Sequence, residues 1–281
     1  MSTFVAAFIA DLRNSHPGQP EFHQAVHDAL MAVAPVLEKN PAYRDTALLE
    51  RLVEPERIIL FRVPWVDDDN RVRVNRGYRV EFSSTLGPFK GGLRFHPGVT
   101  LGILKFLAFE QTLKNSLTTL PLGGAKGGAD FDPKGRSDHA VMRFCQSFMN
   151  ELFRHVGPHI DILAGDIGVD RREIGLLFGQ YKRLRNTFDP GVMGKAVDSG
   201  GTLLRVESTG YGCAWFAAEM LASRGDSFAN KRVAISGSGT VALYAAEKVA
   251  QLGGTVVAMS DSRGFIVDDH GIAGEKLEFL K

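Results

Sequence analysis

The chain has 281 residues and a formal net charge of +1, with 44% hydrophobic and 23% charged residues. This composition is ordinary for a soluble globular protein, and the length predicts about two domains. A charge so close to zero excludes a global basic field for nucleic acid or an acidic membrane, and no stretch reaches the roughly 20 apolar residues of a membrane span.

The two cysteines, Cys145 and Cys213, are too few for a disulfide framework or a zinc site, and they predict reduced thiols in a cytoplasmic protein. The N-terminus has neither the basic segment nor the cleavage site of a secretory signal. Two pairs of histidines four residues apart lack an acidic or cysteine partner, so we expect no metal site.

The first predicted elements are two helices, over residues 3–13 and 21–39. Apolar residues of the second helix recur at every third or fourth position, as on a helix with one buried face. These residues are Phe22, Val26, Leu30, Val33 and Leu37. Two strands over 58–66 and 72–82, joined by the turn DDDN, predict an antiparallel pair at a sheet edge, the second half-exposed because valines alternate with polar residues.

Glycine-rich segments interrupt the middle of the chain. We expect loops at GPFKGGLRFHPG (87–98) and PLGGAKGGAD (121–130), with a helix between them over 100–118 that Thr100 caps. A helix, a short strand and another helix follow between residues 137 and 184. This alternation favours an α/β fold with parallel strands.

A second unit is expected to begin near residue 200, after a boundary within 190–201. A helix over 208–225 and a strand, turn, helix and strand over 231–262 predict a Rossmann-like dinucleotide-binding domain. We therefore expect an N-terminal α/β substrate-binding and oligomerisation domain in residues 1–200, and a cofactor-binding domain, incomplete, in residues 201–281.

The segment GSGTVA fits the pattern G-x-G-x-x-G/A, with Gly237, Gly239 and Ala242 in the three positions. It follows an apolar strand and opens a helix, which is the context that a dinucleotide-binding turn requires. Gly237 would form the tight turn, and Gly239 would let the backbone approach a pyrophosphate at the helix N-terminus. Asp261, at the end of the next strand, stands where a ribose-binding acid belongs.

The same residues leave the choice of cofactor open. Asp261 alone favours a cofactor without a 2′-phosphate, whereas Ser262 and Arg263, which follow directly, could hold such a phosphate. A plain βαβ turn that binds no ligand is the other interpretation of the pattern.

Lys126 lies among glycines, which permit unusual backbone conformations and leave room for a ligand. A lysine held away from water, or near other cations, has a lowered pKa and can act in acid–base chemistry near neutral pH. Lys90 has a similar glycine setting, and Gln111 and Lys114 share one helix face. Together these groups would suit a small dicarboxylate, with Asp166 as the proton carrier; the alternative is that each lysine is a solvated surface charge.

Several segments resemble the glutamate dehydrogenase family. They are GPFKGGLRFHP, LKFLAFEQTLKNSLTTLPLGGAKGGADFDPKG, AGDIGV and STGYG, and SGSGTVA…SDSRG most resembles the hexameric NADP-dependent branch. The similarity extends from about residue 20 to the end of the chain. It implies a cytoplasmic homohexameric enzyme of nitrogen assimilation that uses NADP(H) and converts L-glutamate reversibly to 2-oxoglutarate and ammonium.

The resemblance also implies roles for individual residues. Lys126 would be the catalytic lysine that polarises the carbonyl and the carbinolamine, and Asp166 would shuttle protons to and from the amino nitrogen. Others would bind substrate or cofactor. The substrate-binding positions are Lys90, Gln111, Lys114 and Gly165, and the cofactor-binding positions are Thr209, Gly237, Ser238, Gly239, Thr240, Asp261 and Ser262.

Three features depart from the family pattern. Thr240 stands where the NADP-dependent branch has asparagine, which would alter cofactor affinity rather than abolish it. Asp170 and Arg171 stand where glycines are usual, so we expect a stiffer loop after Asp166. The chain also ends too soon for a dinucleotide domain, which typically needs on the order of 100–150 residues; we expect a C-terminal truncation with open sheet edges, an uncovered apolar face and a missing substrate-binding serine.

Two alternatives remain open. One is a dehydrogenase for another amino acid, which Lys90 disfavours because a second cation is useful mainly for a second carboxylate. The other is a non-catalytic remnant that retains the assembly and substrate domain, which the early end of the chain favours. Such a remnant would bind little or no cofactor.

Overall fold

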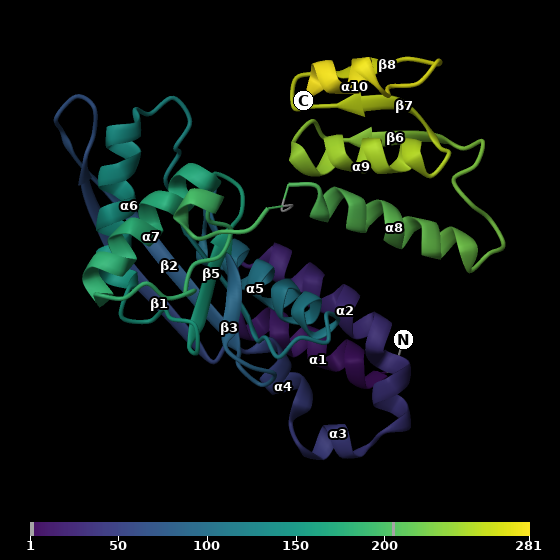
Figure 1. Cartoon of the computed structure of the whole chain (residues 1–281). Coiled ribbons are helices and arrows are strands. Elements are labelled where there is room, and N and C mark those ends of the chain that lie inside the picture. Colours follow the sequence, from purple (N-terminus) through teal and green to yellow (C-terminus); the bar gives the residue numbers. More distant parts are fainter. Residues whose placement is uncertain (1–2, 204–205) are drawn as a thin grey trace. The chain divides into compact units, whose positions relative to one another are not determined.

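The computed structural model describes residues 3–203 and 206–281, and the chain divides into two compact units, Met1–Gly201 and Thr202–Lys281 (Figure 1). The first unit is built on a five-stranded sheet and the second on a three-stranded sheet. None of the described helices is long and apolar enough to cross a membrane.

The strands of the first unit lie in the order β1-β2-β4-β3-β5. Their bounds are Arg57–Val66 for β1, Val72–Ser83 for β2, Phe89–Phe95 for β3, Gly124–Ala129 for β4 and Asp161–Gly165 for β5. β1 pairs antiparallel with β2, and β2 with β4, whereas β3 runs parallel to both β4 and β5. The predicted antiparallel pair at a sheet edge and the predicted parallel strands are both confirmed.

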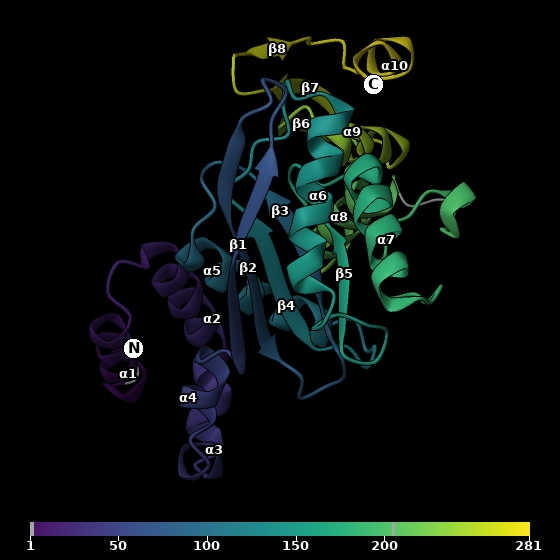
Figure 2. The same ribbon diagram turned by 90° about the vertical axis from the view of Figure 1, so that its left-hand side faces the viewer.

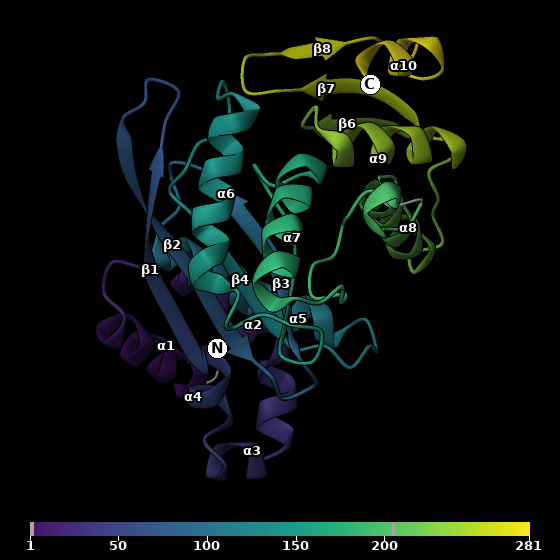
Figure 3. The same ribbon diagram turned by 60° about the vertical axis from the view of Figure 1, so that its left-hand side comes forward.

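Helices cover both faces of this sheet. On one face lie α6 (Asp138–Leu152) and α7 (Arg171–Arg185), and on the other lie α5 (Leu101–Ser116) and α2 (Pro20–Lys39), as Figures 2 and 3 show. The shorter helical elements are α1 (Thr3–Ser15), α3 (Ala42–Asp45), α4 (Leu48–Val53) and the 3₁₀ turn η1 (Val197–Ser199). Each face buries its own cluster of apolar side chains, and each fully buried large side chain stabilises the fold by about 1.5–3 kcal/mol.

Local sequence determines where three helices of the first unit begin. Thr100 accepts a hydrogen bond from the backbone of Ile103 at the start of α5, and Ser137 caps α6 in the same way. The Thr100 cap is as predicted. Asp170 forms a capping box with Glu173 at the start of α7, so its departure from the family pattern serves the helix that follows Asp166.

The two glycine-rich segments predicted as loops contain strands instead. GPFKGGLRFHPG contains β3, and PLGGAKGGAD contains the buried central strand β4. Their glycines allow close packing: a Cβ on Gly91 would overlap the carbonyl of Ala125, and one on Gly124 would overlap Thr112 of α5. Because glycine contributes neither side-chain alternation nor apolar bulk, the sequence pattern of these strands is hidden.

Two smaller predictions are wrong at single residues. Val33 is exposed, and Ala34 takes its place on the buried face of α2. Val72 and Val74 are 72% and 61% exposed. They lie beyond Gly77, where the pairing of β2 with β4 ends. Among the described strands, this part of β2 pairs only with β1, and it projects from the covered sheet.

The second unit consists of layers in which α8 packs on α9 and α9 packs on the sheet (Figure 1). The bounds are Ser208–Ala222 for α8, Arg232–Ser236 for β6, Thr240–Gln251 for α9, Thr255–Ser260 for β7, Phe265–Val267 for β8 and Glu275–Leu280 for α10. β6 and β7 are parallel and α9 connects them, which confirms the predicted βαβ unit. Among the described residues, β6 and the antiparallel β8 each pair only with β7.

Candidate active site

Lys126 lies in β4, at the centre of the first unit's sheet, and is only 7% exposed. Side chains two apart on a strand share a face, so Lys126 points to the same side as Gly124, against which α5 packs. Its Nζ lies 3.2 Å from Oδ1 of Asp166. The surrounding glycines therefore let strands and a helix close around one lysine, which places the amine in a confined and partly dry setting.

This setting changes the acidity of Lys126. Burial lowers the pKa of its ammonium below the usual 10.5, the Asp166 carboxylate opposes that change, and the nearby cations Arg94 and Lys114 add to it. The direction agrees with the prediction for a lysine held away from water. Such an amine releases its proton closer to neutral pH than an exposed lysine does.

Asp166 directly follows β5 and is held between two cations. Arg94 donates from Nε to Oδ2 at 2.6 Å, and Lys126 contacts the other carboxylate oxygen. Burial raises the pKa of the Asp166 carboxyl, but the two cations outweigh burial and the pKa falls below 3.8. Asp166 is therefore ionised at neutral pH and can accept a proton.

Sequence reasoning missed Arg94, although a signal for it was present. Arg94 lies four residues after Lys90 in the segment GPFKGGLRF, and an even spacing on one strand puts both cations on the same face. It also missed Glu110 of α5. Burial raises the pKa of the Glu110 carboxyl above its ordinary value, and the charge of Lys126 opposes this change only in part. Both residues surround the amine that the glycine pattern had singled out.

Helix α5 presents two of the predicted substrate-binding residues. Gln111 is nearly buried, and its Nε2 donates to Oδ1 of Asn115 at 2.8 Å. Lys114 is exposed, yet it is close enough to Lys126 for its charge to lower the pKa of that amine. The helix therefore presents one fixed amide and one exposed ammonium near the lysine.

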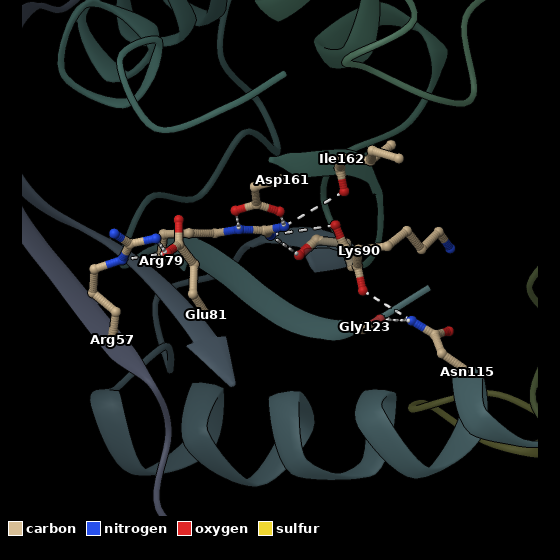
Figure 4. A network of polar contacts seen from close by, with 10 residues as sticks. Arg57, Arg79, Glu81, Lys90, Asn115, Gly123, Asp161 and Ile162 are labelled. Atoms are coloured by element: carbon tan, nitrogen blue, oxygen red, sulfur yellow. Dashed lines mark hydrogen bonds and ion pairs between the residues drawn. The ribbon is translucent and has the colours of Figure 1, made fainter. Parts of the chain in front are cut away.

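Two further predicted residues come from the parallel strands. Lys90 is half-buried in β3 and pairs with Ile162 of β5, and Figure 4 shows its side chain extending away from the buried polar residues beside it. Gly165 ends β5, and its carbonyl oxygen would lie 2.7 Å from a Cβ on Gly92. A side chain at Gly92 would therefore push β3 away from the carbonyl that precedes Asp166.

A fully buried ion pair supports these strands (Figure 4). Arg79 of β2 donates from Nε to Oδ2 of Asp161 at 2.7 Å, and its other guanidinium nitrogens reach that carboxylate and, at 3.3 and 3.4 Å, the carbonyls of Gly91 and Gly92. One side chain thus connects β2, β3 and β5. Removing one partner of such a pair typically costs about 3–5 kcal/mol, because a charge is left buried and unpaired.

In the second unit, the glycine turn and the end of β7 line one open pocket of about 530 Å³. Its lining residues are Ser236, Gly237, Ser238, Ser260, Asp261, Ser262 and Arg263. Gly237 has a φ of +119°, which favours glycine, and Gly239 directly precedes α9 with open space where a Cβ would be. The sequence motif and the acid at the next strand end are therefore brought together, as predicted.

Other predicted cofactor residues lie close to the start of α9. Thr240 is the first residue of α9, and no described side chain caps this helix, so its first N–H groups are available to an anion. Thr209 lies in the first turn of α8, where Gly210 packs against the backbone of Val241 and Tyr244. Asp261 is partly engaged, because its Oδ1 accepts from the backbone of Arg263 and Gly264.

Comparison with known proteins gives two family matches. Residues 55–183 match the Glu/Leu/Phe/Val dehydrogenase dimerisation domain, and residues 200–281 match the Glutamate/Leucine/Phenylalanine/Valine dehydrogenase domain. The chain is 56% identical over 278 residues to the NADP-specific glutamate dehydrogenase of Helicobacter pylori, covering 99% of this chain and 62% of that relative. It is 54% identical over 274 residues to the same enzyme of Escherichia coli, covering 98% and 61%.

Solved structures give the same result. A crystal structure of Plasmodium falciparum glutamate dehydrogenase superimposes with a TM-score of 0.93 at 50% identity, covering 98% of this chain and 59% of that chain. Another glutamate dehydrogenase structure superimposes with a TM-score of 0.95 at 50% identity, covering 99% and 63%. The chain thus spans roughly three fifths of the length of the relatives that it matches.

Proposed function

The chain belongs to the Glu/Leu/Phe/Val dehydrogenase family, within it to the NADP-dependent glutamate dehydrogenases, and from this we propose that it carries the NADP-dependent glutamate dehydrogenase reaction. The reaction is the reversible oxidative deamination of L-glutamate to 2-oxoglutarate and ammonium. The observation that carries the proposal is the buried Lys126 amine 3.2 Å from the Asp166 carboxylate.

The paired amine and carboxylate fit the two tasks of this chemistry. Lys126 would donate to the substrate oxygen and so stabilise the charge that develops on it when ammonia adds to the carbonyl. Asp166, kept ionised by Lys126 and Arg94, would take a proton from the nitrogen and return it in the reverse direction. Arg94 would keep the carboxylate at the position from which it can do so.

The remaining polar groups fit a small dicarboxylate. Lys90 and Lys114 supply one cation each, from β3 and α5, and the amide of Gln111 lies on the same helix as Lys114. Two cations match a ligand with two carboxylates better than a ligand with one. This favours glutamate and 2-oxoglutarate over amino acids with apolar side chains. The backbone of Gly165 would contribute a further contact.

The second unit would hold NADP(H). The uncapped first turn of α9, reached through Gly237, Ser238, Gly239 and Thr240, fits a pyrophosphate, and the pocket lined by Asp261, Ser262 and Arg263 fits the ribose and its 2′-phosphate. Thr209 would be a further contact. When bound, the nicotinamide supplies the hydride chemistry, and the protein supplies binding and orientation.

The organisation of the protein is part of the proposal. Residues 1–200 would bind the substrate and form the contacts of an oligomer, a homohexamer by resemblance, and residues 201–281 would bind the cofactor. The match of residues 55–183 to a family domain described as a dimerisation domain supports this division. We place the protein in the cytoplasm, which its two free cysteines and its enzyme family support.

The test measures binding and turnover separately on the 281-residue chain. We expect calorimetry to detect binding of NADPH and of 2-oxoglutarate. The absorbance of NADPH should fall only when both 2-oxoglutarate and ammonium are present. Pyruvate in place of 2-oxoglutarate should give a much slower decrease. A Lys126→Ala variant should fold, still bind NADPH and lose turnover. A folded chain that binds neither ligand would refute the proposal, and substrate binding without cofactor binding would favour the non-catalytic alternative.

A further inference from the structure

Asn115 of α5 connects three parts of the candidate active site through one buried side chain. Its Nδ2 donates to the carbonyl of Lys90 at 3.1 Å and to the carbonyl of Gly123 at 2.5 Å, and its Oδ1 accepts from Nε2 of Gln111 at 2.8 Å (Figure 4 shows the first two). Asn115 is 4% exposed. Both N–H groups of the amide and one side of its oxygen are therefore engaged by neighbouring groups of the site.

These bonds fix the orientation of two amides without ambiguity. A backbone carbonyl can only accept, so the nitrogen of Asn115 must face Lys90 and Gly123. Its oxygen must then face Gln111. Because this oxygen can only accept, Gln111 must donate from its own amide nitrogen. The amide oxygen of Gln111 is consequently turned away from Asn115, and Gln111 presents one defined set of donor and acceptor atoms.

The carbonyl of Lys90 lies in a part of β3 that the ladder to β4 does not reach. That ladder joins Leu93 to Gly127 and continues from there toward Phe95, so it begins three residues after Lys90. Asn115 binds this carbonyl from α5, outside the β3–β4 ladder. Since Gly123 directly precedes β4, the same amide also fixes β3 relative to the strand that carries Lys126.

We propose that Asn115 is a positioning residue of this site, which sets the Lys90 backbone and the Gln111 amide together for binding of a small dicarboxylate. The inference rests on the proposed function, because it assigns the ligand class of the same site. Asn115 need not touch the ligand. It acts by limiting the freedom of two groups that would otherwise each lose conformational entropy on binding.

The test compares Asn115→Ala and Asn115→Asp with Asn75→Ala. The aspartate keeps the shape and the acceptor for Gln111 but removes both donors. Asn75 is a matched control in the same unit: it accepts from Trp65 at 2.8 Å and donates to the backbone and side chain of Asp130 at 2.9 and 3.0 Å. These bonds lie just beyond the opposite end of β4 from Gly123.

We expect both Asn115 variants to raise the Kd for 2-oxoglutarate about 10- to 100-fold, since small displacements of positioning groups have effects of that size. The Kd for NADPH should not change. Asn75→Ala should lower the unfolding temperature but leave the Kd for 2-oxoglutarate within about twofold of wild type, a margin far below the effect expected of misplaced site groups. Wild-type affinity in the folded Asn115 variants, or an equal loss in Asn75→Ala, would overturn the inference.

A second measurement separates this inference from the proposed function. In the ligand-free chain, the side-chain amide signals of Gln111 in a nitrogen–proton correlation spectrum should be resolved in wild type and averaged in Asn115→Ala. If wild type binds no 2-oxoglutarate, the proposed function fails and the ligand class assigned here fails with it, yet this signal still reports whether Asn115 positions Gln111. An unchanged Gln111 signal in Asn115→Ala would overturn the positioning role itself, whatever ligand binds.

Discussion

At the scale of single residues, the first unit combines a helpful and a costly feature in Lys126. An ammonium in a largely buried strand is poorly solvated, and the contact with Asp166 compensates for this only in part, because the net effect of its surroundings is a lowered pKa. The same lowered pKa suits acid–base chemistry near neutral pH. Lys126 is therefore a position where function and stability are expected to conflict.

Lys126→Met should make the fold more stable at pH 7 by about 1 kcal/mol, because it removes a buried charge while Arg94 still pairs with Asp166. In the wild type, the unfolded chain binds more protons than the folded chain between the lowered pKa of Lys126 and 10.5. The unfolding free energy of the wild type should thus rise with pH in that window. In Lys126→Met this contribution to the pH dependence should be absent.

Urea unfolding at pH 7 and pH 10 measures both effects. The exposed Lys39→Met is the control, and it should keep the wild-type dependence on pH. A Lys126→Met protein that is less stable than wild type at pH 7 would show that the Asp166 contact outweighs burial, contrary to the argument above.

At the scale of elements, the glycines of the central strands allow close packing because they have no side chain. β4 and its neighbours approach one another closely because Gly91, Gly124 and Gly127 present no side chains to the structures packed against them. The carboxyl ends of the parallel strands β3 and β5 then bring Arg94 and Asp166 to one edge of the sheet. Ligands in open α/β sheets bind beyond this edge.

Gly124→Ala should destabilise the protein by about 1–3 kcal/mol or more, because the added methyl group overlaps Thr112 and forces α5 away from β4. Affinity for 2-oxoglutarate should fall with it, since α5 carries Gln111 and Lys114. Gly179→Ala in α7 meets open space and should instead stabilise the helix by about 0.5–1 kcal/mol. Thermal unfolding with calorimetry checks both, and a neutral Gly124→Ala would contradict the packing argument.

At the scale of the whole molecule, the chain has two compact units, and each carries its own set of candidate functional groups. The first holds the Lys126 amine, the Asp166 carboxylate and the two cations proposed to bind a dicarboxylate, and the second holds the glycine turn and its pocket. Each unit has an apolar core of its own. We therefore expect each ligand to bind to one unit and to protect mainly that unit from hydrogen exchange.

Hydrogen exchange followed by mass spectrometry tests this division. NADPH should slow exchange in the turn between β6 and α9 and in residues 260–264, and 2-oxoglutarate should slow exchange in β3, β4 and the C-terminal half of α5. Protection of the same segments by both ligands would contradict the assignment of one ligand to each unit.

The sequence alone predicted most helices, the edge hairpin and the βαβ unit, and it singled out Lys126 and Asp166 as candidate catalytic residues. Those predictions depend on local information: periodicity, capping residues, glycine spacing and charge in an unusual setting. The strands β3 and β4 were missed because their glycines carry no pattern. The contact of Arg94 with Asp166, 72 residues away in the chain, has no local signature.

The sequence thus determined which family the chain resembles and which residues are the candidates for its chemistry, since both are written in short contiguous motifs. Only the tertiary structure decided that Lys126 lies in a central strand, that Arg94 bonds to the Asp166 carboxylate, and that Asn115 bonds to Gln111. Each of these depends on the pairing of distant segments in one sheet, and pairing is set by packing over the whole unit rather than by any single stretch.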